Sequence, residues 1–296
     1  MPINLQMGVF YALLAGILWG IGPLLLKKGM TLSNVSAATL IEQCVSVLVL
    51  GILAGLRGEL VQLDFASKAF RFFALAGIIG ASFGKIFYYK GIDTVGASKA
   101  TSVKNSSPLL TTILAVVFLG EDLTLPIALG VVLIVFGIGV LTRMEIKGEG
   151  RPNRLIYFFY PLLAAICFGI NPVFKKMGIN AANLPTLGSF TSQATALAVM
   201  LTAGRLLKIK PKWEPIPMKS LVLFSVSGIT EALGSLFTFY ALSYAPAVLV
   251  SPVWRISPLV TFVLARFMLK GVEVVTLTDG MAASLIVGGI FVLSLG

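Results

Sequence analysis

The chain has 296 residues, of which 57% are apolar and 12% charged, and its mean hydropathy is +0.96. Soluble domains are about 45–50% apolar and about 25% charged, so this composition predicts an integral membrane protein. The formal charge of +11 is scattered over loops and helix ends rather than gathered in a patch that would bind nucleic acid, and the lack of any histidine excludes imidazole catalysis and most zinc sites.

Ten apolar runs follow one another along the chain. A helix needs about 20 apolar residues to cross a bilayer, and a helix pairs its own backbone N–H and C=O groups inside lipid. We therefore expect an all-α, polytopic membrane protein with ten transmembrane helices. They are predicted at residues 7–28, 36–56, 69–90, 97–119, 125–142, 155–174, 184–206, 219–242, 246–269 and 274–295. No connection between them is long enough to form a soluble enzyme domain.

The two halves of the chain resemble each other. Tyr11–Gly29 and Tyr160–Gly178 are identical at 10 of 19 ungapped positions. Further identical residues follow at similar spacing: Gln43 and Gln193, Tyr89 and Tyr240, Ser107 and Ser257. Because each half has an odd number of spans, the second half must be inverted relative to the first. We predict two five-helix repeats, residues 1–147 and 148–296, around a central site that opens alternately to the two sides of the membrane.

Five ionisable residues lie well inside the predicted spans, namely Glu42, Lys85, Lys104, Glu231 and Arg255. A charge at the centre of a span costs about 2.5 kcal/mol or more when it faces lipid, so these side chains should face a polar interior. Two acids can neutralise two of the three bases, which leaves one positive charge for an anionic ligand such as a carboxylate or a phosphate. The alternative is a fixed network of salt bridges that binds no ligand.

Aromatic residues near these charges could stack on a ligand or cover its apolar part. The candidate substrate-binding residues are therefore Lys104, Arg255, Glu231, Glu42, Lys85, Trp254, Tyr89, Tyr240 and Trp19. Among them, Lys104 and Arg255 are expected to contact a carboxylate or phosphate. Glu231 is the expected proton carrier and Glu42 the balancing charge.

Several motifs resemble those of the drug/metabolite transporter superfamily, specifically its EamA-type members. They are Leu18-Trp19-Gly20-x-x-Pro23, SPLLTTILAVVFLGEDLT at Ser107–Thr124 and SPLV at Ser257–Val260. This resemblance covers the whole chain and implies ten helices in two inverted repeats, a central cavity and secondary transport of small metabolites.

A shorter motif refines the expected cargo. Lys104-Asn-Ser-Ser-Pro108 looks like the K-x-x-x-P of plastid triose-phosphate translocators, in which cations hold phosphate. However, Trp254-Arg255 stands where those proteins have a Lys-Arg pair. The loss of one cation favours a singly charged carboxylate over a phosphate.

The expected function is secondary active transport, as an exporter or exchanger, of small anionic or zwitterionic metabolites such as amino acids or organic acids. The alternatives are a flippase for lipid-linked headgroups, an efflux protein for non-anionic substrates, or a channel. We expect no enzymatic activity, cofactor or metal, because histidine and paired magnesium-binding carboxylates are absent. No ATP-binding G-x-x-x-x-G-K-[ST] motif occurs, so proton or solute antiport is the expected drive.

The expected location is the plasma membrane, with the lipid bilayer and a small-molecule substrate as partners. The orientation stays open. Loops on the side of the termini hold 5 Lys and Arg residues, Lys175 and Lys176 among them, and the opposite loops hold 13. The positive-inside rule then places the termini outside the cytoplasm, whereas the family resemblance implies cytoplasmic termini.

Overall fold

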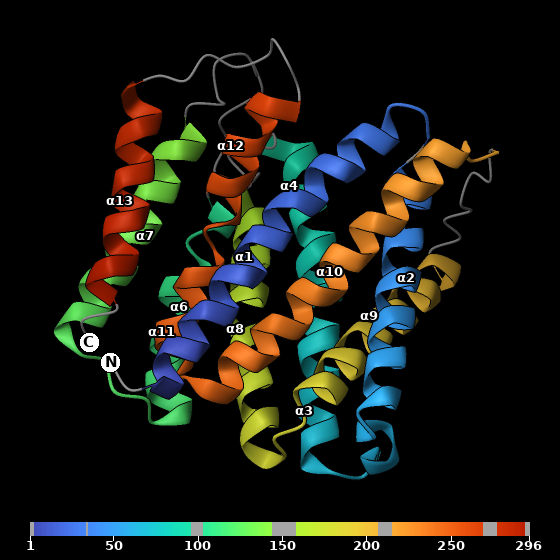
Figure 1. Ribbon diagram of the computed structural model, residues 1–296, viewed down its shortest axis with the longest axis horizontal. Helices are drawn as coiled ribbons and strands as arrows, with labels where there is room; N and C mark the ends of the chain where they lie inside the picture. Colours follow the sequence, from blue (N-terminus) through green and yellow to red (C-terminus); the bar gives the residue numbers. More distant parts are fainter. Residues whose placement is uncertain are drawn as a thin grey trace.

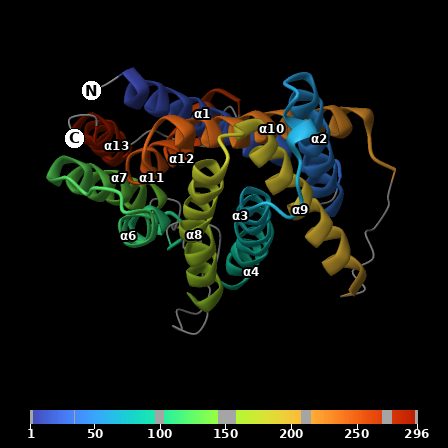
Figure 2. The same ribbon diagram turned by 90° about the horizontal axis from the view of Figure 1, so that it is seen from below.

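The computed structural model describes residues 3–33, 35–95, 103–143, 158–206, 215–268 and 277–293. Within these ranges it contains helices and short connections but no strand (Figure 1 and, turned by 90°, Figure 2). The helices are α1 (Ile3–Met30), α2 (Val35–Leu56), η1 (Glu59–Gln62), α3 (Lys68–Ala76), η2 (Gly77–Gly84), α4 (Lys85–Val95), α6 (Ser107–Leu119), α7 (Leu125–Arg143), α8 (Phe159–Ala181), α9 (Pro185–Leu206), α10 (Met218–Tyr244), α11 (Ala247–Trp254), α12 (Ser257–Met268) and α13 (Leu277–Leu293). The predicted repeat boundary at residues 147 and 148 lies outside the described residues.

The all-α architecture with ten spans is confirmed. Within the described residues, five helical stretches are long and apolar enough to cross a membrane on their own: Ile3–Met30, Ala37–Leu56, Lys68–Tyr88, Phe159–Ala181 and Met218–Tyr244. The third predicted span is built from α3, the π-helical stretch η2 and α4, and the ninth from α11 and α12. One boundary differs clearly, because α8 continues to Ala181, past its predicted end at residue 174.

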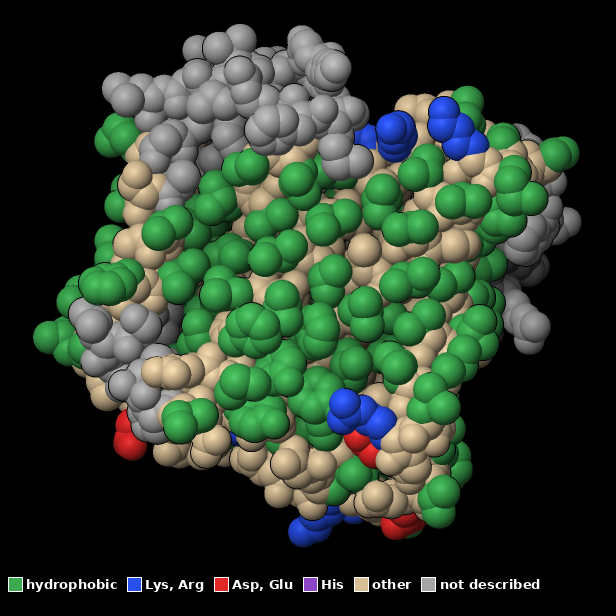
Figure 3. Space-filling model, in the orientation of Figure 1, with side chains coloured by type: hydrophobic (Ala, Val, Ile, Leu, Met, Phe, Trp, Pro, Cys, Tyr) green, Lys and Arg blue, Asp and Glu red, His purple; other side chains and the backbone are tan. Residues whose placement is uncertain are grey.

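The surface has the character of a protein embedded in lipid. Apolar side chains cover the middle of the face shown in Figure 3, and the Lys, Arg, Asp and Glu side chains visible there lie towards its upper and lower ends. Large apolar residues such as Leu48, Phe136 and Val287 are more than half exposed, at 63%, 62% and 58%. A monomeric soluble protein rarely exposes so continuous an apolar surface.

The two repeats make equivalent contacts with each other. Thr111 on α6 donates its hydroxyl hydrogen to the Gly169 carbonyl on α8 at 2.8 Å, and Thr261 on α12 donates to the Gly20 carbonyl on α1 at 2.9 Å. The two threonines are equivalent in the repeats, and so are the two glycines. Each repeat therefore packs its first helix against the fourth span of the other, and neither could bury these faces alone.

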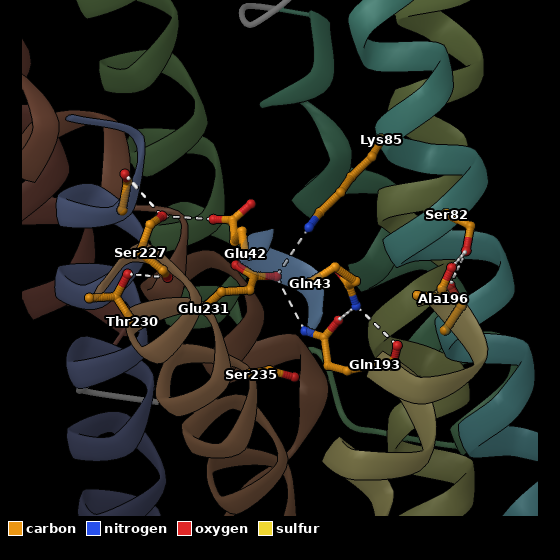
Figure 4. A network of polar contacts seen from close by, with 12 residues as sticks. Glu42, Gln43, Ser82, Lys85, Gln193, Ala196, Ser227, Thr230, Glu231 and Ser235 are labelled. Atoms are coloured by element: carbon orange, nitrogen blue, oxygen red, sulfur yellow. Dashed lines mark hydrogen bonds and ion pairs between the residues drawn. The ribbon is translucent and has the colours of Figure 1, made fainter. Parts of the chain in front are cut away.

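A glutamine pair lies where the repeats meet. The Gln43 side-chain amide donates to the side-chain oxygen of Gln193 at 2.8 Å and to its backbone carbonyl at 3.0 Å. Equivalent residues of two inverted repeats can touch only close to the axis that relates them, so this pair lies beside the pseudo-two-fold axis. Gln193 also donates to Glu231 at 3.2 Å, so the axis runs next to the buried charges (Figure 4).

Candidate functional site

The fourth span of each repeat is interrupted before a Ser-Pro dipeptide. Proline lacks the N–H that would continue the helical hydrogen bonds, so a regular helix restarts at Ser107 and at Ser257. The connecting turns are tight; for example, the Arg255 backbone N–H donates to the Pro252 carbonyl at 3.1 Å. These interruptions place Lys104 and Arg255 beside non-helical backbone in the middle of the bundle, an arrangement that transporters use to build binding sites.

A cavity of about 230 Å³ lies between α1, α2, η2, α4, α8, α9, α10 and the two interrupted spans. The five ionisable residues predicted inside the membrane all line it, and Lys175 joins them. Trp19 and Trp254, two of the predicted aromatic residues, also line it, together with Tyr88 and Phe168. Side chains from eight of the ten spans thus meet around one polar space.

One predicted site residue, Tyr240, lies away from the cavity. The Tyr240 hydroxyl is hydrogen-bonded to the Arg57 guanidinium and lies 3.1 Å from the Thr186 hydroxyl, at the end of α10 nearest the termini. The Arg57 guanidinium also lies over the Tyr240 ring, 5.2 Å from its centroid. Tyr240 therefore connects helix ends rather than lining the cavity. Tyr89 belongs to α4, but its side chain lies outside the described part of the structure.

The acidic side of the cavity is a hydrogen-bonded network, shown in Figure 4. Lys85 Nζ lies 3.3 Å from Glu231 Oε1, and this is the one ion pair found among the described residues. Gln193 donates to the same Glu231 oxygen, while Glu42 accepts a hydrogen bond of 2.8 Å from Ser227. Of the two acids, Glu231 is thus held by a lysine and Glu42 by a hydroxyl.

The basic side of the cavity is built around the ring of Phe168. Lys104 Nζ lies 5.8 Å from the centroid of this ring and 4.4 Å from that of Tyr88. The Arg255 guanidinium lies 5.4 Å from the Phe168 centroid and donates to the Phe168 carbonyl at 3.3 Å. Within the described residues, neither cation forms an ion pair. An anion that enters next to Phe168 would therefore meet two positive groups with no competing carboxylate.

Lys175 is a cavity residue that the sequence places in a loop. It is 5% exposed, its ammonium donates to the Thr238 hydroxyl at 3.0 Å, and it lies 4.9 Å from the centroid of the Phe239 ring. The missed signal is helical spacing, because Phe168, Asn171, Pro172 and Lys175 recur on one face of α8. Four bases and two acids thus line the cavity, and the formal excess is two positive charges.

Lys176, its neighbour, belongs to the helix as well. Its ammonium donates to the carbonyls of Leu242 at 2.6 Å and Ala245 at 3.1 Å, at the end of α10. Carbonyls at a helix C-terminus lack partners within the helix, and a cation there also interacts favourably with the helix dipole. Two of the five basic residues assigned to loops on the terminal side therefore lie within α8.

Two packed aromatic rings lie between the central cavity and a second pocket. Phe239, which contacts Lys175, packs edge-to-face on Phe73 with 5.5 Å between ring centroids, and both are at most 1% exposed. On the other side of Phe73 lies a second pocket of about 260 Å³, lined in part by Asp64, Ser67 and Thr191. The Phe73–Phe239 pair thus separates the central cavity from a pocket on the terminal side.

Comparison with known proteins agrees with this architecture. The EamA-like transporter family matches residues 6–143 and 155–295. A solved crystal structure with 16% sequence identity superposes with a TM-score of 0.81 over 98% of this chain and 97% of its own, and shows the same fold.

Two relatives are similar over part of their length. The S-adenosylmethionine uptake transporter of Rickettsia conorii (strain ATCC VR-613 / Malish 7) is 28% identical over 185 residues, which is 62% of this chain and 59% of the relative. An uncharacterized transporter of Clostridium kluyveri (strain ATCC 8527 / DSM 555 / NBRC 12016 / NCIMB 10680 / K1) is 26% identical over 130 residues, 44% of this chain and 42% of the relative. The matches to these relatives thus span about half of their length. Since the family match covers nearly the whole sequence in two halves, this chain belongs to the EamA-like transporter family.

Proposed function

We propose that this protein is a secondary active transporter that carries small anionic or zwitterionic metabolites, such as amino acids or organic acids, through its central cavity. The observation that carries the proposal is the placement of Lys104 and Arg255 on one aromatic ring, without an ion pair among the described residues. Membership of a transporter family supports transport rather than catalysis.

The cavity offers separate partners for the two charges of a zwitterion. A guanidinium binds a carboxylate through two parallel hydrogen bonds, and the Lys104 ammonium can add a third contact. Glu231 on the opposite wall, and Glu42 when it is ionised, can interact with an ammonium group, while Trp19 and Trp254 cover apolar parts of the ligand. This set suits a molecule of amino-acid size.

The proposal also includes an energy source for transport and a location. The sequence has no ATP-binding motif, so an ion or solute gradient is the proposed energy source. The plasma membrane is the proposed location. The name of the Rickettsia relative adds one specific ligand to test, because S-adenosylmethionine itself contains an amino-acid group.

A thermal-shift screen of the purified protein tests the substrate class. Amino acids, organic acids, S-adenosylmethionine, sugar phosphates and nucleosides are added in turn, and the unfolding temperature is measured. A ligand at about 100 times its Kd stabilises the folded state by about 2.7 kcal/mol. We expect this stabilisation from ligands that carry a carboxylate.

Substitutions in the cavity test whether the ligand that raises the unfolding temperature binds there. Arg255→Ala and Lys104→Ala should remove the stabilisation, whereas Arg71→Ala, which changes an exposed residue at the start of α3, should retain it. Stabilisation by non-anionic ligands alone, or stabilisation that survives both cavity substitutions, would contradict the proposal and favour an efflux protein for other substrates.

A further inference from the structure

The carboxyl group of Glu42 is buried without a cation. Its side chain lies in the cavity wall and the residue is 8% exposed. Its hydrogen-bond partner is the Ser227 hydroxyl at 2.8 Å, and within the described residues it forms no ion pair. Removing an ionised carboxylate from water costs several kcal/mol unless a charge or several donors replace the water. One hydroxyl does not provide that, so ionised Glu42 is poorly compensated.

The charged groups around Glu42 do not compensate its negative charge. From α10 it faces Glu231, a second negative charge, and from α4 it faces Lys85, whose ammonium is bound to Glu231 at 3.3 Å. The neighbouring helices α1 and α9 contribute no charged side chain to this part of the wall; they contribute Gly22, Pro23, Leu26, Ser192 and Gln193. Two carboxylates therefore share one lysine, and Glu231 holds it. A proton on Glu42 removes the remaining negative charge.

The Ser227 hydroxyl has one hydrogen and two acceptors within reach. Glu42 Oε1 lies at 2.8 Å and the Gly22 carbonyl of α1 at 3.3 Å (Figure 4 shows the Glu42 contact). When Glu42 is ionised, Ser227 donates to it and no longer to Gly22. When Glu42 is protonated, its own O–H donates to Ser227, and the Ser227 hydrogen is available to Gly22. Only the protonated form makes both hydrogen bonds.

We infer that Glu42 is the proton-binding group of this transporter, and that Ser227 couples its protonation to α1 by redirecting one hydrogen bond. The proton enters from water in the cavity, binds Glu42 Oε1 and leaves the same way, and no other bond changes. Because α1 and α10 pack along each other, this hydrogen bond lies between two spans that border the site. The inference rests on the proposed secondary transport and moves the role expected of Glu231 to Glu42.

Infrared difference spectroscopy tests the inference without a substrate. Purified protein in lipid nanodiscs is titrated above about pH 6, where ordinary surface carboxyls are already ionised. The C=O stretch of a protonated carboxyl should be present and should disappear as pH rises. Glu42→Gln should abolish this band. The control is the double variant Lys85→Met/Glu231→Gln, which removes the other acid together with the lysine that it holds, and it should keep the band. Gel filtration checks that each variant is folded.

The outcomes separate the alternatives. A band that persists in Glu42→Gln, or that disappears in a folded Lys85→Met/Glu231→Gln protein, overturns the assignment. If Glu42→Gln does not fold, the spectrum of the Lys85→Met/Glu231→Gln protein decides alone. Ser227→Ala should shift the frequency of the band because the carboxyl loses its hydrogen-bond partner, and an unchanged frequency overturns the role of Ser227. Since no substrate is used, a failed ligand screen with this band intact would contradict only the proposed function.

Discussion

The positive excess of the cavity comes from cations whose partners are neutral. Lys104 and Arg255 lie on aromatic faces, and Lys175 contacts a hydroxyl and an aromatic ring. A cation–π contact contributes about 0.5–2 kcal/mol, less than the several kcal/mol that each buried ion loses in hydration. An anion that enters the cavity can therefore gain interaction energy that the protein itself leaves unused.

The location of these charges could be predicted from the sequence, but their pairing could not. A charge inside an apolar run must face a polar interior, which is why Glu42, Lys85, Lys104, Glu231 and Arg255 were identifiable. Pairing depends on how distant helices meet; Lys85 and Glu231 are 146 residues apart. Lys175 escaped the prediction because it directly follows the end of an apolar run, where a loop is the simpler expectation.

Glu121 provides a test at the residue scale. Its carboxylate accepts the backbone N–H groups of Ala247 and Val248, each at 2.8 Å, in the first turn of α11. Hydrogen bonds to a charged group contribute about 1.5–3 kcal/mol, and the negative charge also suits a helix N-terminus. We expect Glu121→Gln to lower the free energy of unfolding by about 1–2 kcal/mol, measured in detergent. Asp122→Asn, at the exposed neighbouring acid, should change it by less than about 0.5 kcal/mol; an equal loss in both would contradict this role.

At the scale of helices, the sequence predicts where the spans lie better than where they are interrupted. The fourth and ninth runs read as continuous apolar segments, although each contains a Ser-Pro dipeptide. A proline in a membrane helix can produce a mild kink or a full break, and the packing of neighbouring helices decides between them. Packing against neighbouring helices also decides the π-helical form of η2. Gly77 lies against the Ser192 backbone and Gly80 against the Asn171 side chain, and neither position has room for a side chain.

Close packing between helices is tested by substitution at Gly178 on α8. A methyl group there would overlap the ring of Phe73, which is 1% exposed and also packs near Gly188, so it has little space to move. Overpacking of this kind costs about 1–3 kcal/mol, and we expect Gly178→Ala to lower stability by that amount. Gly288 on α13 is the control, because nothing lies within 4 Å of an added methyl group. Thermal unfolding of Gly288→Ala should show no loss; equal losses in both variants would contradict the packing explanation.

At the scale of the whole molecule, one pair of equivalent aromatic residues is placed differently in the two repeats. On the terminal side, Phe239 packs on Phe73, and neither ring lines the cavity. Its equivalent in the first repeat is Tyr88, one position before Tyr89, and Tyr88 lines the cavity. An exchange of conformations between the repeats would pack Tyr88 away from the cavity and bring Phe239 to line it. This is the rearrangement that alternating access requires of inverted repeats.

The repeat organisation could be predicted from the sequence because duplicated residues keep their spacing. Gly20 and Gly169, for example, accept equivalent hydrogen bonds in the structure. The orientation in the membrane is harder to predict, since the loop count depends on which basic residues are in loops. Lys175 and Lys176 show that a basic residue at the edge of an apolar run can serve the site or cap a helix end.

Counterflow in proteoliposomes tests the central claim most directly. Vesicles are loaded with the unlabelled carboxylate ligand that gives the largest thermal shift, and uptake of a labelled trace is followed without ATP. Carrier transport through the cavity predicts transient, saturable accumulation of the label by the wild type, and none by Arg255→Ala protein inserted at the same yield. Flux that rises linearly with concentration, or full accumulation by Arg255→Ala, would contradict the account.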